Sequence, residues 1–155
     1  MKIKIELLIL SAFLLSCGAG IQHDAANQEK VPIEGTWKLI SGTTIQKNDT
    51  VTTNYTKERS FIKIINGTHF SFLEHDLDKG KNKDSVFTAG GGSYSLNGNS
   101  YTERLEYCSD RAWEGHDFNF TIKIENDTLT QSGIEKIDSL GVNRINIEKY
   151  IRVKN

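Results

Sequence analysis

The sequence predicts an all-β fold, an antiparallel up-and-down barrel of about eight strands, over residues 35–155. Three observations predict it. Apolar and polar residues alternate with a period of two, turn-forming residues recur at short intervals, and almost no stretch repeats its apolar residues at helical spacing. Such a meander either packs as a sandwich or closes into a barrel, and closure removes the exposed strand edges.

The alternation is clearest between residues 118 and 125. Phe118, Phe120, Ile122 and Ile124 occupy every second position there, with polar residues between them. Shorter stretches of the same kind occur at residues 61–65, 70–72 and 93–96. Since successive side chains of a strand point to opposite faces, each stretch predicts a strand with one apolar face and one face in water.

Turn chemistry separates these stretches. Asn66-Gly67, Asn97-Gly98 and Asn126-Asp127 consist of residues that tolerate the positive φ of two-residue hairpins. Gly90 to Gly92 predicts a bend or a bulge, and the charged run from Leu77 to Asp84 predicts a loop. The intervals between these breaks fit strands joined in sequence.

Residues 1–16 have the layout of an export signal. Lys2 and Lys4 precede an apolar run from Leu7 to Leu15, which is shorter than the roughly 20 residues that span a bilayer. The run ends at Ser16-Cys17, and this pattern resembles the site at which bacteria acylate a cysteine and cleave the chain before it. We therefore predict lipidation of Cys17. The alternatives are an ordinary signal peptide with an incidental cysteine, or an apolar N-terminal helix of the fold.

Cleavage before Cys17 would leave one domain on a tether. Residues 17–34 are small and polar and predict the lipidated cysteine with a flexible linker, and residues 35–155 form the predicted domain. Loss of Lys2, Lys4 and Glu6 would change the formal charge from −1 to −2, so no basic surface for nucleic acid is expected. With Cys17 lipidated, Cys108 has no partner for a disulfide within the chain.

The start of the predicted domain, Gly35-Thr36-Trp37, resembles the Gly-x-Trp motif of lipocalins and related calycin barrels. In that family the tryptophan plugs the closed end of an eight-stranded barrel, and an arginine near the last strand packs across its ring. The resemblance implies that Arg152, with Lys149 as the second choice, takes this place. Gly35, Trp37 and Arg152 would then have a structural role. The second lipocalin motif, of the Thr-Asp-Tyr type, is missing from the sequence.

The stretch from Gly35 to the C-terminus also resembles the small lipocalin-like lipoproteins of Bacteroidetes, most of which have no characterised function. The residues that carry this resemblance are the Gly-x-Trp start, Gly91-Gly92-Ser93-Tyr94, Asn97-Gly98, Tyr101-Thr102-Glu103 and the ending Glu148-Lys149-Tyr150. The resemblance implies a cavity for a small, mostly apolar molecule.

Tyr101, Glu103 and Tyr107 are the candidate ligand-binding residues. They share a phase with Leu105 and are predicted to face the barrel interior, where a carboxylate needs a cation or several donors. Lys149, in phase with Ile145 and Ile151, is the predicted cation. Two interpretations of Glu103 remain, a ligand contact and a structural ion pair or outward position, and the second is favoured.

Neither a metal site nor a catalytic site is predicted. The four histidines have no zinc spacing, and the run that begins at Asp76 does not place its glycine and its last carboxylate as a calcium loop does. There is no nucleophile elbow and no phosphate loop. We therefore expect no cofactor and no enzymatic activity, although a hydrolase or isomerase on a barrel scaffold is a third, weaker hypothesis.

The sequence thus predicts a membrane-anchored binding module outside the cytoplasm. Its partners would be the membrane, through the lipid, and a small apolar ligand. The alternative is an envelope module that binds a protein or a glycan through an outer face or through the loop Leu77 to Asp84. Gly18 after the cysteine differs from the aspartate that often retains lipoproteins in the inner membrane, so the outer membrane is the expected location.

Overall fold

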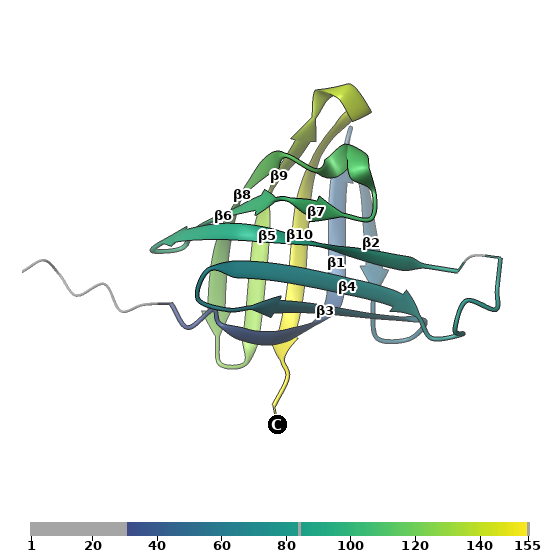
Figure 1. Ribbon diagram of the computed structural model, residues 1–155, viewed down its shortest axis with the longest axis horizontal. Helices are drawn as coiled ribbons and strands as arrows, with labels where there is room; N and C mark the ends of the chain where they lie inside the picture. The colour runs from purple at the N-terminus through teal and green to yellow at the C-terminus, as the bar shows by residue number, and fades with distance from the viewer. Residues whose placement is uncertain (1–30, 84, 155) are drawn as a thin grey trace, which may run out of the picture.

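The computed structural model describes residues 31–83 and 85–154, which form an antiparallel β-barrel with two short 3₁₀ turns (Figure 1). The predicted export signal, Cys17 and most of the tether lie outside the described residues, as does Asp84. The strands are β1 Gly35–Gln46, β2 Asp49–Asn54, β3 Arg59–Ile65, β4 His69–Asp76, β5 Phe87–Asn97, β6 Ser100–Leu105, β7 Tyr107–Cys108, β8 His116–Glu125, β9 Thr128–Ile137 and β10 Val142–Arg152. The 3₁₀ turns are η1 Arg111–Trp113 and η2 Asp138–Leu140.

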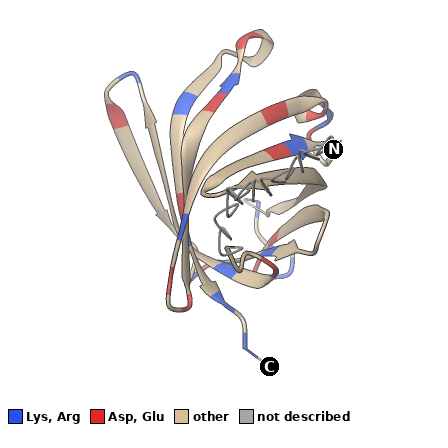
Figure 2. Cartoon of the chain, turned by 90° about the vertical axis from the view of Figure 1, so that its left-hand side faces the viewer, with Lys and Arg blue, Asp and Glu red and all other residues tan. Residues whose placement is uncertain are grey.

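Eight of the strands close the barrel, in the order β10-β9-β8-β6-β5-β4-β3-β1, and β1 pairs again with β10. All these pairings are antiparallel, and β2 and β7 are two additional strands. Seen from the side, the sheet curls fully around on itself, and charged residues of both signs are spread along it (Figure 2). The predicted all-β barrel is therefore confirmed, with eight strands in the closed sheet.

Strand β1 changes neighbours halfway along its length. Its first residues, from Gly35 to Lys38, pair with β3, whereas Ser41 to Gln46 pair with β2. β10 runs along the whole of β1, with a register shift between Leu39 and Ser41. Beside the second half of β1, the β1–β2 hairpin therefore continues the barrel wall, because β3 no longer pairs with β1 there.

The hairpins use the turn chemistry in different ways. Asn126 and Gly98 have positive φ values of 54° and 58°, as their residue types favour. Asn66 instead accepts hydrogen bonds from the backbone amides of Thr68 and His69 through its side chain. Lys47 and Asn48, with φ of 50° and 67°, form the β1–β2 turn, which the sequence pattern did not indicate.

The glycines of β5 permit close approach between strands. A Cβ at Gly92 would collide with the backbone oxygen of Arg104, and a Cβ at Gly90 would overlap the ring of Phe72. The chain leaves the β6 ladder after Leu105 and pairs again with β5 as β7, opposite Gly90 and Gly91. The predicted bend at the glycines thus corresponds to a break between β6 and β7.

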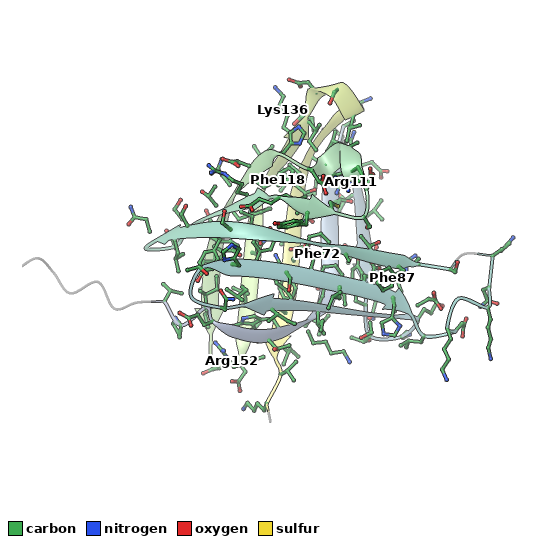
Figure 3. The ribbon with its side chains drawn as sticks, in the orientation of Figure 1. Phe72, Phe87, Arg111, Phe118, Lys136 and Arg152 are labelled. Carbon is green, nitrogen blue, oxygen red and sulfur yellow. The ribbon has the colours of Figure 1, made fainter. Side chains whose placement is uncertain are left out.

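One end of the barrel is closed by a packed core. Trp37, Leu129 and Tyr150 have no exposed surface there, and Trp37 Nε1 donates a hydrogen bond of 2.7 Å to the Ile33 carbonyl. The guanidinium carbon of Arg152 lies 4.0 Å from the centroid of the Trp37 ring. Figure 3 places Arg152 at this end, opposite Arg111 and Lys136.

The packed domain begins before Gly35, where the sequence pattern predicted its start. Ile33 is fully buried in the core, and Val31 packs against that core. Arg152 donates hydrogen bonds to the carbonyls of Glu34 and Pro32 at 2.7 and 2.5 Å. The last residues of the predicted tether are therefore part of the domain, because the closing arginine satisfies their backbone.

Candidate functional site

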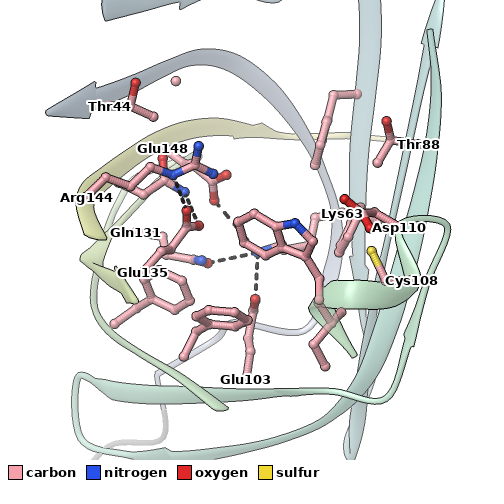
Figure 4. A pocket seen from close by; sticks show the side chains of 18 of the residues that line it. Thr44, Lys63, Thr88, Glu103, Cys108, Asp110, Gln131, Glu135, Arg144 and Glu148 are labelled. Atoms are coloured by element: carbon pink, nitrogen blue, oxygen red, sulfur yellow. Dashed lines mark hydrogen bonds and ion pairs between the residues drawn. The ribbon is translucent and has the colours of Figure 1, made fainter. Parts of the chain in front are cut away.

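The inside of the barrel contains a cavity of about 460 Å³. It lies between the closed end and the end that carries η1, and the β1–β2 hairpin forms part of its wall. Part of the lining is aromatic, with side chains from β3, β4, β8, η1 and the turn after β2, and part consists of charged or amide side chains (Figure 4). The aromatic lining residues are Tyr55, Phe61, Phe72, Trp113, Phe118 and Phe120; the polar ones include Lys63, Glu103, Asp110, Gln131, Glu135, Arg144, Asn146 and Glu148.

Lys63 is the centre of the deeper polar cluster. Its side chain is buried, and Nζ donates hydrogen bonds to Glu103 Oε1 at 2.7 Å and to Gln131 Oε1 at 3.0 Å. A second carboxylate, Glu148, has Oε2 at 3.9 Å from the same Nζ. The ammonium also lies 5.4 Å from the centroid of the Tyr150 ring, which adds cation-π attraction.

The charges of this cluster depend on one another. Burial alone would lower the pKa of Lys63, but Glu103 and Glu148 raise it above the ordinary value, so the ammonium stays protonated. Burial raises the pKa of Glu103, against the opposing effect of Lys63. One buried ammonium thus neutralises part of the charge of two carboxylates.

Glu148 interacts with the Lys63 ammonium more weakly than Glu103 does, because it lies farther away. Its Oε2 accepts a hydrogen bond of 2.7 Å from the Tyr150 hydroxyl, whose pKa is raised by burial and by the charge of Glu148. Its other oxygen, Oε1, accepts no hydrogen bond within the described part of the chain. The carboxylate is partly exposed toward the cavity and is available to a ligand.

A second polar cluster lies nearer the opening. Arg144 Nε donates to Glu135 Oε2 at 2.6 Å, and Asn146 Nδ2 donates to Glu135 Oε1 at 2.8 Å. The Arg144 guanidinium carbon lies 5.4 Å from the centroid of the Trp113 ring. Both oxygens of Glu135 are therefore satisfied, and Arg144 is held between a carboxylate and an aromatic face.

The structure brings two of the three predicted ligand-binding residues into the interior. Glu103 is buried in an ion pair with Lys63, as its structural interpretation expects, and it also lines the cavity, as a ligand contact would require. Tyr101 is fully buried beside it; its hydroxyl makes no well-aligned hydrogen bond within residues 31–83 and 85–154, although burial and the neighbouring Glu103 carboxylate raise its pKa.

The predicted orientation of Tyr107 is wrong. Its side chain is 69% exposed, because the break after Leu105 interrupts the alternation and β7 starts a new phase. The chain at this break is held by the side chain of Glu106, which accepts a hydrogen bond from the Ser93 hydroxyl at 2.6 Å. Tyr107 consequently lies outside the cavity.

The predicted cation is also wrong. Lys149 is exposed, and the inward positions of β10 are Arg144, Asn146, Glu148 and Tyr150. The isoleucines of β10 face outward, so the phase inferred from them is inverted. The missed partner, Lys63, shares the phase of Phe61 and Ile65 in β3, and a lysine in the phase of an apolar strand face is a sign of an internal charge.

The described residues contain no group of histidine, cysteine and carboxylate side chains placed to hold a metal ion. Cys108, at the cavity wall, is a free thiol whose pKa is raised by burial. No helix within the described ranges is long and apolar enough to cross a membrane.

The fold and the cavity define the protein as an eight-stranded antiparallel barrel with a partly charged interior. No protein-family model matches the sequence, and neither does any curated protein.

Proposed function

We propose that this protein is a lipid-anchored, lipocalin-like module of the bacterial cell envelope that binds a small molecule inside its barrel. The observation that carries the proposal is the cavity of about 460 Å³, which lies within the range typical of small-molecule sites. The barrel is closed at one end by Trp37 and keeps its cavity toward the other end. The proposal assigns binding and no reaction to this site.

The lining favours a ligand that is partly apolar and partly polar. Phe61, Phe72 and Phe118 offer apolar area, as the expected apolar ligand requires. Lys63, Glu103 and Glu148 lie at the same cavity and form hydrogen bonds or ion pairs, so a purely apolar molecule would leave polar groups dehydrated. We therefore extend the expected apolar ligand to an amphiphilic one.

The chain enters the barrel at its closed end. Residues 31–34 are held against Trp37 and Arg152, which lie opposite η1 (Figures 1 and 3). A tether that leads to a lipid on Cys17 would therefore join the domain away from the cavity opening. Lipidation of Cys17 and location at the outer membrane, both inferred from the sequence, complete the proposal.

Native mass spectrometry tests the binding function. The protein is isolated with its lipid from its own host, and small molecules are released from it and identified. A stoichiometric molecule bound to the native protein but absent from heat-denatured protein is expected. Isolation of the barrel without any such molecule, under mild conditions and from several growth states, would contradict the proposal.

The anchor is tested separately. Cys17→Ala removes the thiol that takes up lipid, so the protein should move from the membrane fraction to the soluble fraction. Cys108→Ala is the matched control and should leave fractionation unchanged. Membrane association of the Cys17→Ala protein equal to that of the unchanged protein would refute the anchor.

A second candidate function is the binding of a protein or glycan to the outside of the barrel. Ile45, Ile145 and Ile134 are register partners across β1, β10 and β9 and share one outer face. Ile134 is 61% and Ile145 42% exposed. Crosslinking in cells from this face, with one dominant protein recovered, would favour this function over the cavity.

A further inference from the structure

The charge of the cavity identifies the class of ligand. We propose that the cavity selects molecules with a protonated amine, seated on Glu148 and attached to an apolar or aromatic body. This inference rests on the proposed ligand-binding function and specifies the chemistry of the same site.

The first argument is charge balance. Among the described residues that line the cavity, Lys63 and Arg144 are the cations, and there are four carboxylates, Glu103, Asp110, Glu135 and Glu148. Arg144 is matched by Glu135 at 2.6 Å. Asp110 is exposed and caps η1. In the deep cluster one ammonium then faces two carboxylates, and the cluster keeps one excess negative charge that a single positive charge would neutralise.

The second argument is the unused hydrogen-bonding capacity of Glu148. Lys63 directs its donors to Glu103 and Gln131 at 2.7 and 3.0 Å, and its distance to Glu148 is 3.9 Å. Tyr150 donates one hydrogen bond to Glu148 Oε2, and Oε1 has no donor within residues 31–83 and 85–154. An ionised carboxylate accepts several hydrogen bonds, so an ammonium N–H supplies what this oxygen lacks.

The third argument is the composition of the walls. Phe61 and Phe72 stack with their ring centroids 5.8 Å apart, and Trp113 and Phe118 form a second aromatic pair at 5.9 Å. All four rings line the cavity. Aromatic faces attract cations and provide apolar area, so they suit an amine with a hydrocarbon body.

An anionic ligand fits this cavity less well. Both cations of the lining are already paired with carboxylates at 2.7 and 2.6 Å. A carboxylate or phosphate would have to displace Glu103 or Glu135 and would add a negative charge beside Glu148. Inside a protein cavity, where charges are screened less than in water, this repulsion is stronger.

The test compares three probes that share one body and differ in the head group: phenylbutylamine, phenylbutanol and phenylbutyrate. Binding to the full chain, purified as the cell processes it and placed in lipid nanodiscs, is measured by calorimetry at neutral pH, with empty nanodiscs as the blank. The amine should bind at least about tenfold more tightly than the alcohol, as one charge-assisted hydrogen bond allows, and phenylbutyrate should bind most weakly.

Glu148→Gln is the decisive variant. It keeps the shape of the side chain and leaves Lys63 paired with Glu103, so the barrel should fold normally, and the preference for the amine should fall to within about twofold. Glu125→Gln makes the same charge change at an exposed site of β8 and should leave the preference intact. Thr44→Lys, which adds a positive charge to the cavity wall opposite Asn146, should also abolish the preference.

The outcomes separate this inference from the proposed function. If the three probes bind equally, or phenylbutyrate binds best, the amine preference is refuted and small-molecule binding stands. Amine preference that persists in both Glu148→Gln and Thr44→Lys refutes the site. If no probe binds while a native ligand is found by mass spectrometry, the amine class is wrong; if no native ligand is found either, both proposals fail.

Discussion

The two ends of the barrel are built by the same strands but from different side chains. In β10, Tyr150 and Arg152 belong to the closed end around Trp37, whereas Glu148 and Arg144 face the cavity. In β3, the buried Ile65 comes two positions after Lys63, on the same face of the strand. A single inward-facing row thus changes from apolar to charged along its length. We infer that the closed end supplies stability and leaves the other end free to bind.

Replacement of Trp37 by alanine should cause the largest loss of stability, because it disrupts the closed end. The side chain is fully buried, donates a hydrogen bond to Ile33 and carries the guanidinium of Arg152 on its ring. Loss of a buried tryptophan costs about 3–5 kcal/mol of the free energy of unfolding. Chemical denaturation followed by circular dichroism measures the loss.

Trp113→Ala is the matched control at the other end. Trp113 is half-buried in η1 at the cavity wall, so its removal should cost about 1 kcal/mol or less and should weaken ligand binding instead. Equal destabilisation by the two tryptophan substitutions would show that stability is not concentrated at the closed end.

Lys63→Met tests the ion cluster between the two ends. The substitution leaves Glu103 and Glu148 buried or partly buried without their cation, which should reduce stability by about 3–5 kcal/mol. The double variant Lys63→Met with Glu103→Gln removes the orphaned charge and should recover most of the loss. Urea denaturation of the two variants compares them, and a double variant no more stable than the single one would contradict this account.

Alkaline pH should destabilise the protein. The pKa of Lys63 is raised by its carboxylate neighbours, although burial opposes the rise, and burial raises the pKa of Tyr150. The folded state therefore holds protons that the unfolded chain releases at a pH of about 10, and stability falls as the pH rises above that value. Melting temperatures measured from neutral pH upward should show the fall, and Tyr150→Phe should make it less steep.

Much of the fold follows from the sequence because alternation reports the faces of a strand. Phe118, Phe120 and Ile122 are buried on the inner face of β8, as their period of two predicts. The same rule predicted the wrong orientation for β10, where the isoleucines face outward and Glu148 faces inward. Alternation separates two faces but does not identify the inner one when the interior is charged.

The cavity was less predictable because it depends on contacts between distant strands. Glu103 was found by its phase in β6, but Lys63 and Gln131, its partners in the cluster, are 40 and 28 residues away from it along the chain. Tyr107 was misplaced because the chain breaks between β6 and β7, where Gly92 lies close to the backbone of Arg104, a contact that no local pattern encodes. Register between strands, rather than residue type, decides which charges meet.

The smallest predicted effect is a gain of stability at the boundary between the two ends. Tyr101 is fully buried, and its hydroxyl has only a poorly aligned contact with the Glu103 carboxylate among the described residues, so folding removes it from water with little compensation. Tyr101→Phe should therefore raise the free energy of unfolding by about 1 kcal/mol, measured by urea denaturation. Tyr150→Phe is the matched control, because its hydroxyl donates to Glu148 and its loss should destabilise. A loss of stability in Tyr101→Phe equal to that in Tyr150→Phe would mean that the Tyr101 hydroxyl is bonded in solution, and that the polar cluster extends further toward the closed end.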